Sequence, residues 1–135
     1  MTVTSRWPHA FFAAAATSAM IGVCWGLTMS IIQNHATYSA HAHLNLLGWT
    51  SLALMGTFYA LLGQSVPNWV KLTNFTLSNV GVISMISGLF MYLGQVGSPV
   101  IYGPLLAVGG LCTVSGFLLF GGTVLSSLVR KPVAA

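Results

Sequence analysis

Four long apolar segments, separated by short polar connections, make up most of this chain. They run from about residue 8 to 32, 40 to 62, 69 to 93 and 100 to 129. Each is longer than the roughly 20 residues that a helix needs to cross the hydrocarbon core of a bilayer. The connections between them contain residues that usually end helices, such as Gln33-Asn34 and Pro67-Asn68. The pattern therefore predicts an all-α integral membrane protein, a four-helix bundle with residues 1–135 as a single domain.

The composition supports a chain surrounded by lipid. Hydrophobic residues make up 56% of the sequence and charged residues only 3%, whereas soluble domains carry about 25% charged residues. The chain has no Asp or Glu at all. It therefore has no side-chain carboxylate for general acid–base catalysis, for metal binding or for an acidic proton relay. The few basic residues are scattered, so we expect no nucleic-acid binding.

The basic residues predict the orientation in the membrane. Arg6 precedes the first segment, Lys71 lies beside the connection between the second and third, and Arg130 and Lys131 follow the fourth. With four spans, all of these positions fall on one side. The positive-inside rule then places both termini in the cytoplasm, and we expect a bacterial inner membrane protein with the connection around His35 on the outer side.

Two histidines, His41 and His43, stand at the start of the second segment. An ionisable side chain in a membrane span is costly and usually marks a functional site. A regular helix turns by about 100° per residue, so these two imidazoles point to nearly opposite sides and cannot easily chelate one ion. Such a helix could lie between two planar cofactors.

The faces below the two histidines are mostly apolar, which is typical of haem sites. Gly48 has no side chain at a point where a flat macrocycle would need space. The residues predicted to share the His41 face are Asn45, Gly48, Leu52, Met55 and Tyr59, and those predicted to share the His43 face are Leu46, Leu47, Thr50, Leu54 and Thr57.

Other residues remain open to two interpretations. His35 is either a solvated loop residue or an additional partner for a cofactor or metal. His9 lies beside Arg6 and is interpreted as an interfacial residue. The pair Gly22 and Gly26 either packs helices together within the chain or belongs to a seam between subunits.

The segment Ala40-His-Ala-His-Leu-Asn-Leu-Leu-Gly48 resembles the ligand helices of the main subunit of the haem-copper oxidase and nitric oxide reductase superfamily. In that family, one helix carries a His-x-His pair that serves two haems on opposite sides. The family's main subunit has twelve helices in three groups of four, with key ligands on the second helix of each group. The resemblance implies that this chain is one such group and that His41 and His43 are axial ligands of a b-type haem, with Asn45 and Gly48 beside it.

One helix cannot supply both axial ligands of a single haem from opposite faces. We therefore expect His41 of one subunit and His43 of the next to hold a haem between them. Such a head-to-tail contact must close into a ring. The three groups of the resembled family make a homotrimer of twelve helices the expected assembly.

The chain also departs from the resembled family. It has no second histidine pair for a copper site and no acidic proton channel. Proton-pumping oxygen reduction is therefore not expected. Electron transfer or diatomic gas (O2 or NO) chemistry remains, with a quinol or a cytochrome as electron donor. A haem or copper handling or sensing protein without catalysis and an accessory subunit of a respiratory complex are the alternatives. Whether the chain is an enzyme, and whether it binds copper, stays open.

Overall fold

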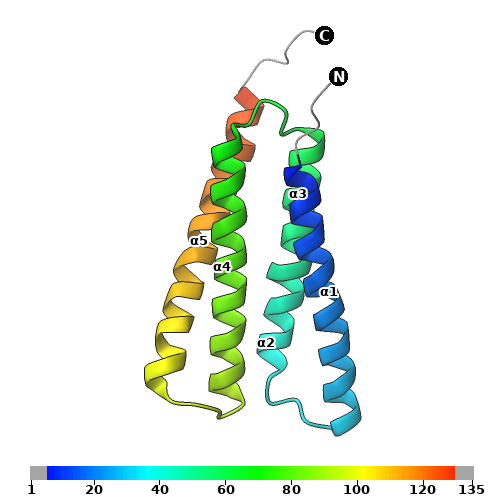
Figure 1. The fold of residues 1–135 in the computed structure, drawn as a ribbon, viewed down its shortest axis with the longest axis vertical. Coiled ribbons are helices and arrows are strands. Elements are labelled where there is room, and N and C mark those ends of the chain that lie inside the picture. The colour runs from blue at the N-terminus through cyan, green and yellow to red at the C-terminus, as the bar shows by residue number, and fades with distance from the viewer. Residues whose placement is uncertain (1–5, 130–135) are drawn as a thin grey trace.

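The computed structural model describes residues 6–129, and these residues form a bundle of long helices (Figure 1). The second helix runs without a break from Tyr38 to Leu61 in three sections, and we call it helix 2. The all-α prediction is confirmed, and each long helix begins and ends within two residues of its predicted span. The elements are α1 (Trp7–Ile32), α2 (Tyr38–His43), the π-helix η1 (Leu44–Ser51), α3 (Leu52–Leu61), α4 (Asn68–Leu93) and α5 (Pro99–Val129).

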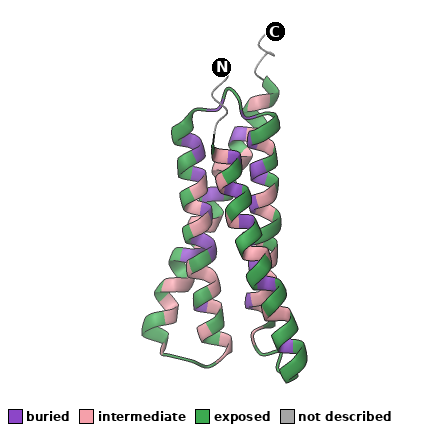
Figure 2. Ribbon diagram, turned by 45° about the vertical axis from the view of Figure 1, so that its right-hand side comes forward, coloured by how far each residue is buried: buried purple, intermediate pink, exposed green. Residues whose placement is uncertain are grey.

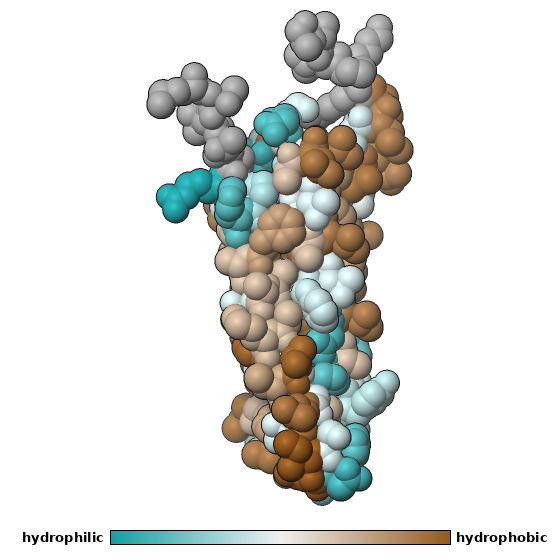
Figure 3. Space-filling view, turned by 90° about the vertical axis from the view of Figure 1, so that its right-hand side faces the viewer, coloured by the Kyte–Doolittle hydropathy of each residue, from teal (hydrophilic) through white to brown (hydrophobic). Residues whose placement is uncertain are grey.

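All four helices are long and apolar enough to cross a membrane. Many of their large aliphatic side chains are exposed, for example Ile31 and Leu111, each with 71% of its surface uncovered. Figure 3 shows such hydrophobic side chains on one face along the length of the bundle. In water, a surface of this kind would be an extended apolar patch. In a bilayer it is the surface that the acyl chains cover, and the chain is accordingly an integral membrane protein.

The helices associate as two pairs, α1 with helix 2 and α4 with α5, and α4 also contacts α2 and η1. Glycines allow the close approach of α4 and α5. A Cβ added at Gly81 would lie 2.5 Å from Thr113 Oγ1, and one added at Gly109 would meet the backbone nitrogen of Met85. Small residues at such contacts are a common way for membrane helices to pack, because they let dispersion forces act between backbones.

The hydrophobic core lies at the end of the bundle where α1 begins, which we call the Arg6 end. There the ring of Phe11 lies 5.2 Å from the rings of Tyr59 and Phe75. Buried residues line the inner faces of the helices (Figure 2). The core consists of Phe11, Ala15, Leu52, Met55, Tyr59, Val66 and Val70.

A buried polar contact ties three helices together near this core. The hydroxyl of Tyr59 donates to Asn74 Oδ1 over 3.3 Å, and Asn74 Nδ2 donates to the carbonyl of Gly116 over 2.8 Å. Asn74 itself is fully buried. Unsatisfied polar groups are expensive in a membrane interior, so each of these bonds both satisfies a buried group and fixes one helix against the next.

Lys71 is buried, with only 3% of its surface exposed. The sequence suggested a charge at the surface beside a connection, whereas the structure covers this side chain in the first turns of α4. The two basic residues that follow α5, Arg130 and Lys131, lie outside the described residues. The predicted orientation in the membrane stays a prediction.

The expectation of a regular helix through residues 40–62 is wrong for Leu44–Ser51, which form a π-helix. In a π-helix each N–H bonds to the carbonyl five residues earlier, so the turn is wider than an α-turn. Two side chains of this section donate hydrogen bonds to backbone carbonyls. Asn45 Nδ2 donates to the carbonyl of His41 over 2.9 Å, and Ser51 Oγ donates to that of Leu46 over 2.7 Å. Such local side-chain bonds compete with the regular backbone pattern.

Candidate haem-ligand site

His43 is held in one tautomer by its own helix. Its Nδ1 lies 2.7 Å from the carbonyl oxygen of Ser39, one turn earlier in α2. A carbonyl can only accept, so Nδ1 carries the proton, and in the neutral imidazole Nε2 then carries the lone pair. This is the arrangement found in metal-binding histidines, in which a hydrogen bond to the second ring nitrogen fixes the tautomer and the orientation of the ring.

His41 lies on the side of helix 2 that faces α1. A Cβ added at Gly26 would lie 2.9 Å from His41 Cε1 and 3.4 Å from Nε2, so the ring fits only because residue 26 is glycine. The ring of Trp25 packs edge-on against it, with the ring centroids 6.4 Å apart. His41 is therefore half-buried in the contact between two helices of one chain.

Asn45 covers the face of the His41 ring. Its Nδ2 lies 3.3 Å from Nδ1 and 3.4 Å from Nε2 of His41. A nitrogen nearly equidistant from both must lie above the ring, because a position in the ring plane would collide with Cε1. The in-plane lone pair of His41 is therefore not the acceptor of a well-aligned bond from Asn45. The same Nδ2 donates to the His41 carbonyl instead.

The two histidines have different surroundings. Below His41, the predicted face continues with residues that are buried: Gly48, Leu52, Met55 and Tyr59. Below His43, the predicted face continues with the lipid-exposed residues Leu46 and Leu54, which are 62% and 63% uncovered. The two predicted faces thus differ in burial below the histidines, whereas the two histidines themselves are both half-buried.

Gly48 makes room for a helix. A Cβ added there would lie 2.8 Å from Ser18 Oγ on α1. The space expected for a flat macrocycle over Gly48 is therefore filled by α1, which corrects the geometric reason given for this residue. The neighbouring contact between α1 and helix 2 is equally close, since a Cβ added at Gly22 would lie 2.5 Å from Asn45 Oδ1. Gly22 and Gly26 thus pack within the chain, one of the two interpretations left open above.

The remaining histidines do not join the pair. His35 is exposed in the connection after α1, where its carbonyl accepts from the N–H of Tyr38 over 3.0 Å. His9 is exposed near the start of α1. Over residues 6–129, no three His, Cys, Asp or Glu side chains come close enough to hold a metal ion together.

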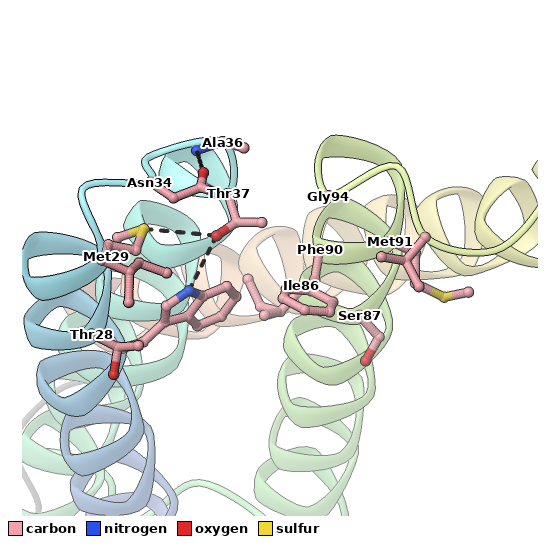
Figure 4. Close-up of a pocket in the computed structure, with 13 residues that line it drawn as sticks. Thr28, Met29, Asn34, Ala36, Thr37, Ile86, Ser87, Phe90, Met91 and Gly94 are labelled. Carbon is pink, nitrogen blue, oxygen red and sulfur yellow. Dashed lines mark hydrogen bonds between the residues drawn. The ribbon is translucent and has the colours of Figure 1, made fainter.

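The structure also contains a cavity that the sequence did not indicate. It has a volume of about 730 Å³ and lies between α1, the connection after it and the last turns of α4 (Figure 4). Trp25 forms part of its wall, and its indole N–H donates to Thr37 Oγ1 over 3.2 Å. The only sequence signal was a tryptophan well inside an apolar segment, where it has no interfacial role.

No family model, curated protein or solved structure matches this chain. The site therefore has to be interpreted from its own geometry.

A haem makes few demands on the donor groups of a protein. A haem iron takes only axial ligands from the protein, and a single imidazole lone pair in apolar surroundings is sufficient for one of them. His43 fits this requirement, because its ring is half-buried and its Nδ1 is bonded to the Ser39 carbonyl. His41 fits less directly, because α1 and Asn45 cover part of its ring.

Proposed function

We propose that this chain is a membrane protein that binds b-type haem, with His43 as the principal axial ligand. The observation that carries the proposal is the hydrogen bond from His43 Nδ1–H to the Ser39 carbonyl. It leaves Nε2 as the coordinating atom and prevents the ring from turning away. The resemblance of residues 40–48 to the ligand helices of haem-copper oxidases supports the same residue.

His41 is proposed as the second axial ligand, supplied to the haem of a neighbouring subunit. The two rings diverge on α2, so one chain cannot direct both at one iron. The predicted face below His43 continues with the exposed side chains of Leu46 and Leu54, a surface for a neighbouring chain to cover. The half-buried ring of His41 would have to turn away from α1 when the subunits associate. It would then lose its contact with the Asn45 side chain.

The proposed assembly is a closed ring of three chains with twelve helices. A ligand pair of this kind is a heterologous contact, and a soluble or membrane assembly of such contacts is finite only if it closes. The resemblance to a family with three groups of four helices favours three. We also propose that both termini are cytoplasmic, because the described basic residues Arg6 and Lys71 lie at the same end of the bundle.

When bound, the haem would supply one-electron oxidation and reduction at the iron, or a binding site for a diatomic gas if an axial position opens. The residues of the chain would hold it. His43 would supply a lone pair to the iron, and the Ser39 carbonyl would fix the orientation of the His43 ring. This makes electron transfer or O2 and NO chemistry the function that the site supports best.

The spectrum of the purified protein tests the proposal. We expect a Soret band and, in the reduced-minus-oxidised difference spectrum, the sharp α band of a six-coordinate b-type haem. Metal analysis of the same sample should give iron and no stoichiometric copper. Haem-replete cells that yield a well-folded protein without haem would contradict the proposal, and copper in place of iron would favour the metal-handling alternative.

Native mass spectrometry tests the assembly separately. In mild detergent we expect three chains with up to three haems. A haem-loaded monomer would show that the second ligand is not His41 of a neighbour and would reject the ring.

A further inference from the structure

Two cavities that share lining residues follow one another along the groove between α1 and α4. The 730 Å³ cavity at the end of the bundle near His35 adjoins a second cavity of about 390 Å³, and both are lined by Trp25, Ile86 and Ser87. The second cavity continues along the helices to Ala14 and Asn79. Ala14 and Thr28 are 14 residues apart on α1, so the space extends for roughly 20 Å along the helix at 1.5 Å per residue. This length suits a molecule with a long tail.

The wider cavity has aromatic walls. The rings of Trp25 and Phe90 lie 5.6 Å apart and are tilted by 71°. Figure 4 shows Ile86 and Phe90 on α4 directed toward α1 across the space. Aromatic and aliphatic walls with a few polar groups are typical of small-molecule sites, whose volumes usually lie between about 300 and 1,000 Å³. The wider cavity therefore suits a compact ring.

The polar groups of this cavity favour an acceptor without charge. None of the described residues that line either cavity is charged. Thr37 is engaged, because its hydroxyl accepts from Trp25 and contacts Met29 Sδ at 3.7 Å. Asn34 Oδ1 accepts from the N–H of Ala36 over 3.0 Å, which leaves the amide nitrogen of that side chain as the donor end. Amide and hydroxyl donors suit carbonyl oxygens, whereas a phosphate headgroup would call for Arg or Lys.

We propose that the groove between α1 and α4 binds an uncharged lipid with a planar carbonyl-bearing ring and a single apolar tail, the chemistry of the isoprenoid quinones. The ring packs against the edge-to-face pair of Trp25 and Phe90, near the donors of Asn34 and Ser87. The tail follows the narrower cavity along Ile83 and Leu44 toward the middle of the bundle. Trp25 also packs against His41, so the ring site adjoins the ligand helix. Binding itself does not depend on the haem proposal, although the proposed function would give the bound ring a redox partner.

Native mass spectrometry of the full chain tests the site with a defined probe, a benzoquinone that carries a short isoprenoid tail. We expect a saturable adduct of one quinone per chain. The mass of this adduct differs from that of haem, so the loss of one can be seen without the loss of the other. Phosphatidylglycerol added in excess should not displace the quinone, because its charged head has no cation to meet.

Two cavity variants and one control connect the adduct to the groove. Ser87→Phe should fill the junction of the two cavities and lower the affinity at least about tenfold. Phe90→Ala removes an aromatic wall without adding bulk and should weaken binding even if Ser87→Phe folds poorly. Val80→Phe adds the same ring to an exposed position of α4 that lines neither cavity, and it should bind normally.

Three results would overturn the proposal. The first is adduct formation that rises linearly with quinone concentration without saturation. The second is equal binding by all of the variants. The third is displacement of the quinone by phosphatidylglycerol, which would identify the groove as a site for ordinary phospholipid chains.

Discussion

In the α4–α5 pair, Gly81 and Gly109 bring two backbones together, whereas in the pair of α1 and helix 2, Gly22 and Gly26 make room for polar side chains. Gly109 faces the backbone of Met85, and Gly81 faces the backbone and side chain of Thr113. Gly22 and Gly26, by contrast, face the side-chain ends of Asn45 and His41. The same residue type thus serves stability in one pair and the placement of candidate site residues in the other.

This difference makes the two pairs respond differently to the same substitution. A backbone cannot move aside without shifting a helix, but the end of a side chain can turn. An added methyl group should therefore destabilise the α4–α5 pair, whereas in the pair of α1 and helix 2 it should mainly displace a candidate ligand or its neighbour.

The largest effect is expected for Gly109→Ala. Its new Cβ would meet the backbone of Met85, and overpacking of this kind costs about 1–3 kcal/mol. Gly110→Ala is the matched control, because a Cβ at Gly110 meets nothing within 4 Å. Thermal unfolding in detergent, followed by circular dichroism, should show a lower midpoint for Gly109→Ala alone. Equal midpoints for both variants would mean that the two helices do not pack as described.

Loss of the buried hydrogen bonds between the two helix pairs should have a somewhat smaller effect on stability. Asn74→Ala removes the acceptor of Tyr59 and the donor to Gly116, and it should cost about 1–2 kcal/mol. Asn79→Ala is the control, because Asn79 Nδ2 bonds only one turn back on its own helix, to the carbonyl of Phe75. The same unfolding measurement applies. A larger loss of stability for Asn79→Ala than for Asn74→Ala would show that the hydrogen bonds of Asn74 to the neighbouring helices do not stabilise the bundle.

The smallest effect on stability, below about 1 kcal/mol, is expected for Gly26→Ala, because the ring of His41 can turn away from the added methyl group. The effect on the site should be larger than the effect on stability. The fraction of six-coordinate haem in the visible spectrum should rise, because the added methyl group favours the ring position turned away from α1 that the proposed ligation requires, and Gly103→Ala, which adds its Cβ to open space, should leave the spectrum unchanged. A strongly destabilised Gly26→Ala protein would show that the pair of α1 and helix 2 tolerates an added methyl group no better than the α4–α5 pair.

The sequence was sufficient for the helices, because they depend on local pattern. Apolar runs between polar connections locate the spans. Leu52, Met55 and Tyr59, which were predicted to share one face, are all buried in the core.

The features that the sequence did not reveal depend on contacts between helices. The π-helix of Leu44–Ser51 leaves no mark in the apolar pattern, and the burial of Lys71 requires the neighbouring helices. The space above Gly48 was expected to be open because the glycine was known while its neighbour Ser18 was not. The cavity beside Trp25 exists only because α1 and α4 contact each other little, which no single segment shows.

The central claim is that His43, fixed by the Ser39 carbonyl, is the principal haem ligand, and reduced visible spectra of three histidine variants test it most directly. His43→Ala should lose the haem, His41→Ala should retain it in a five-coordinate form, and His35→Ala, which changes an exposed loop residue, should match the unmodified protein. A His43→Ala protein that keeps the unmodified six-coordinate spectrum would contradict the claim.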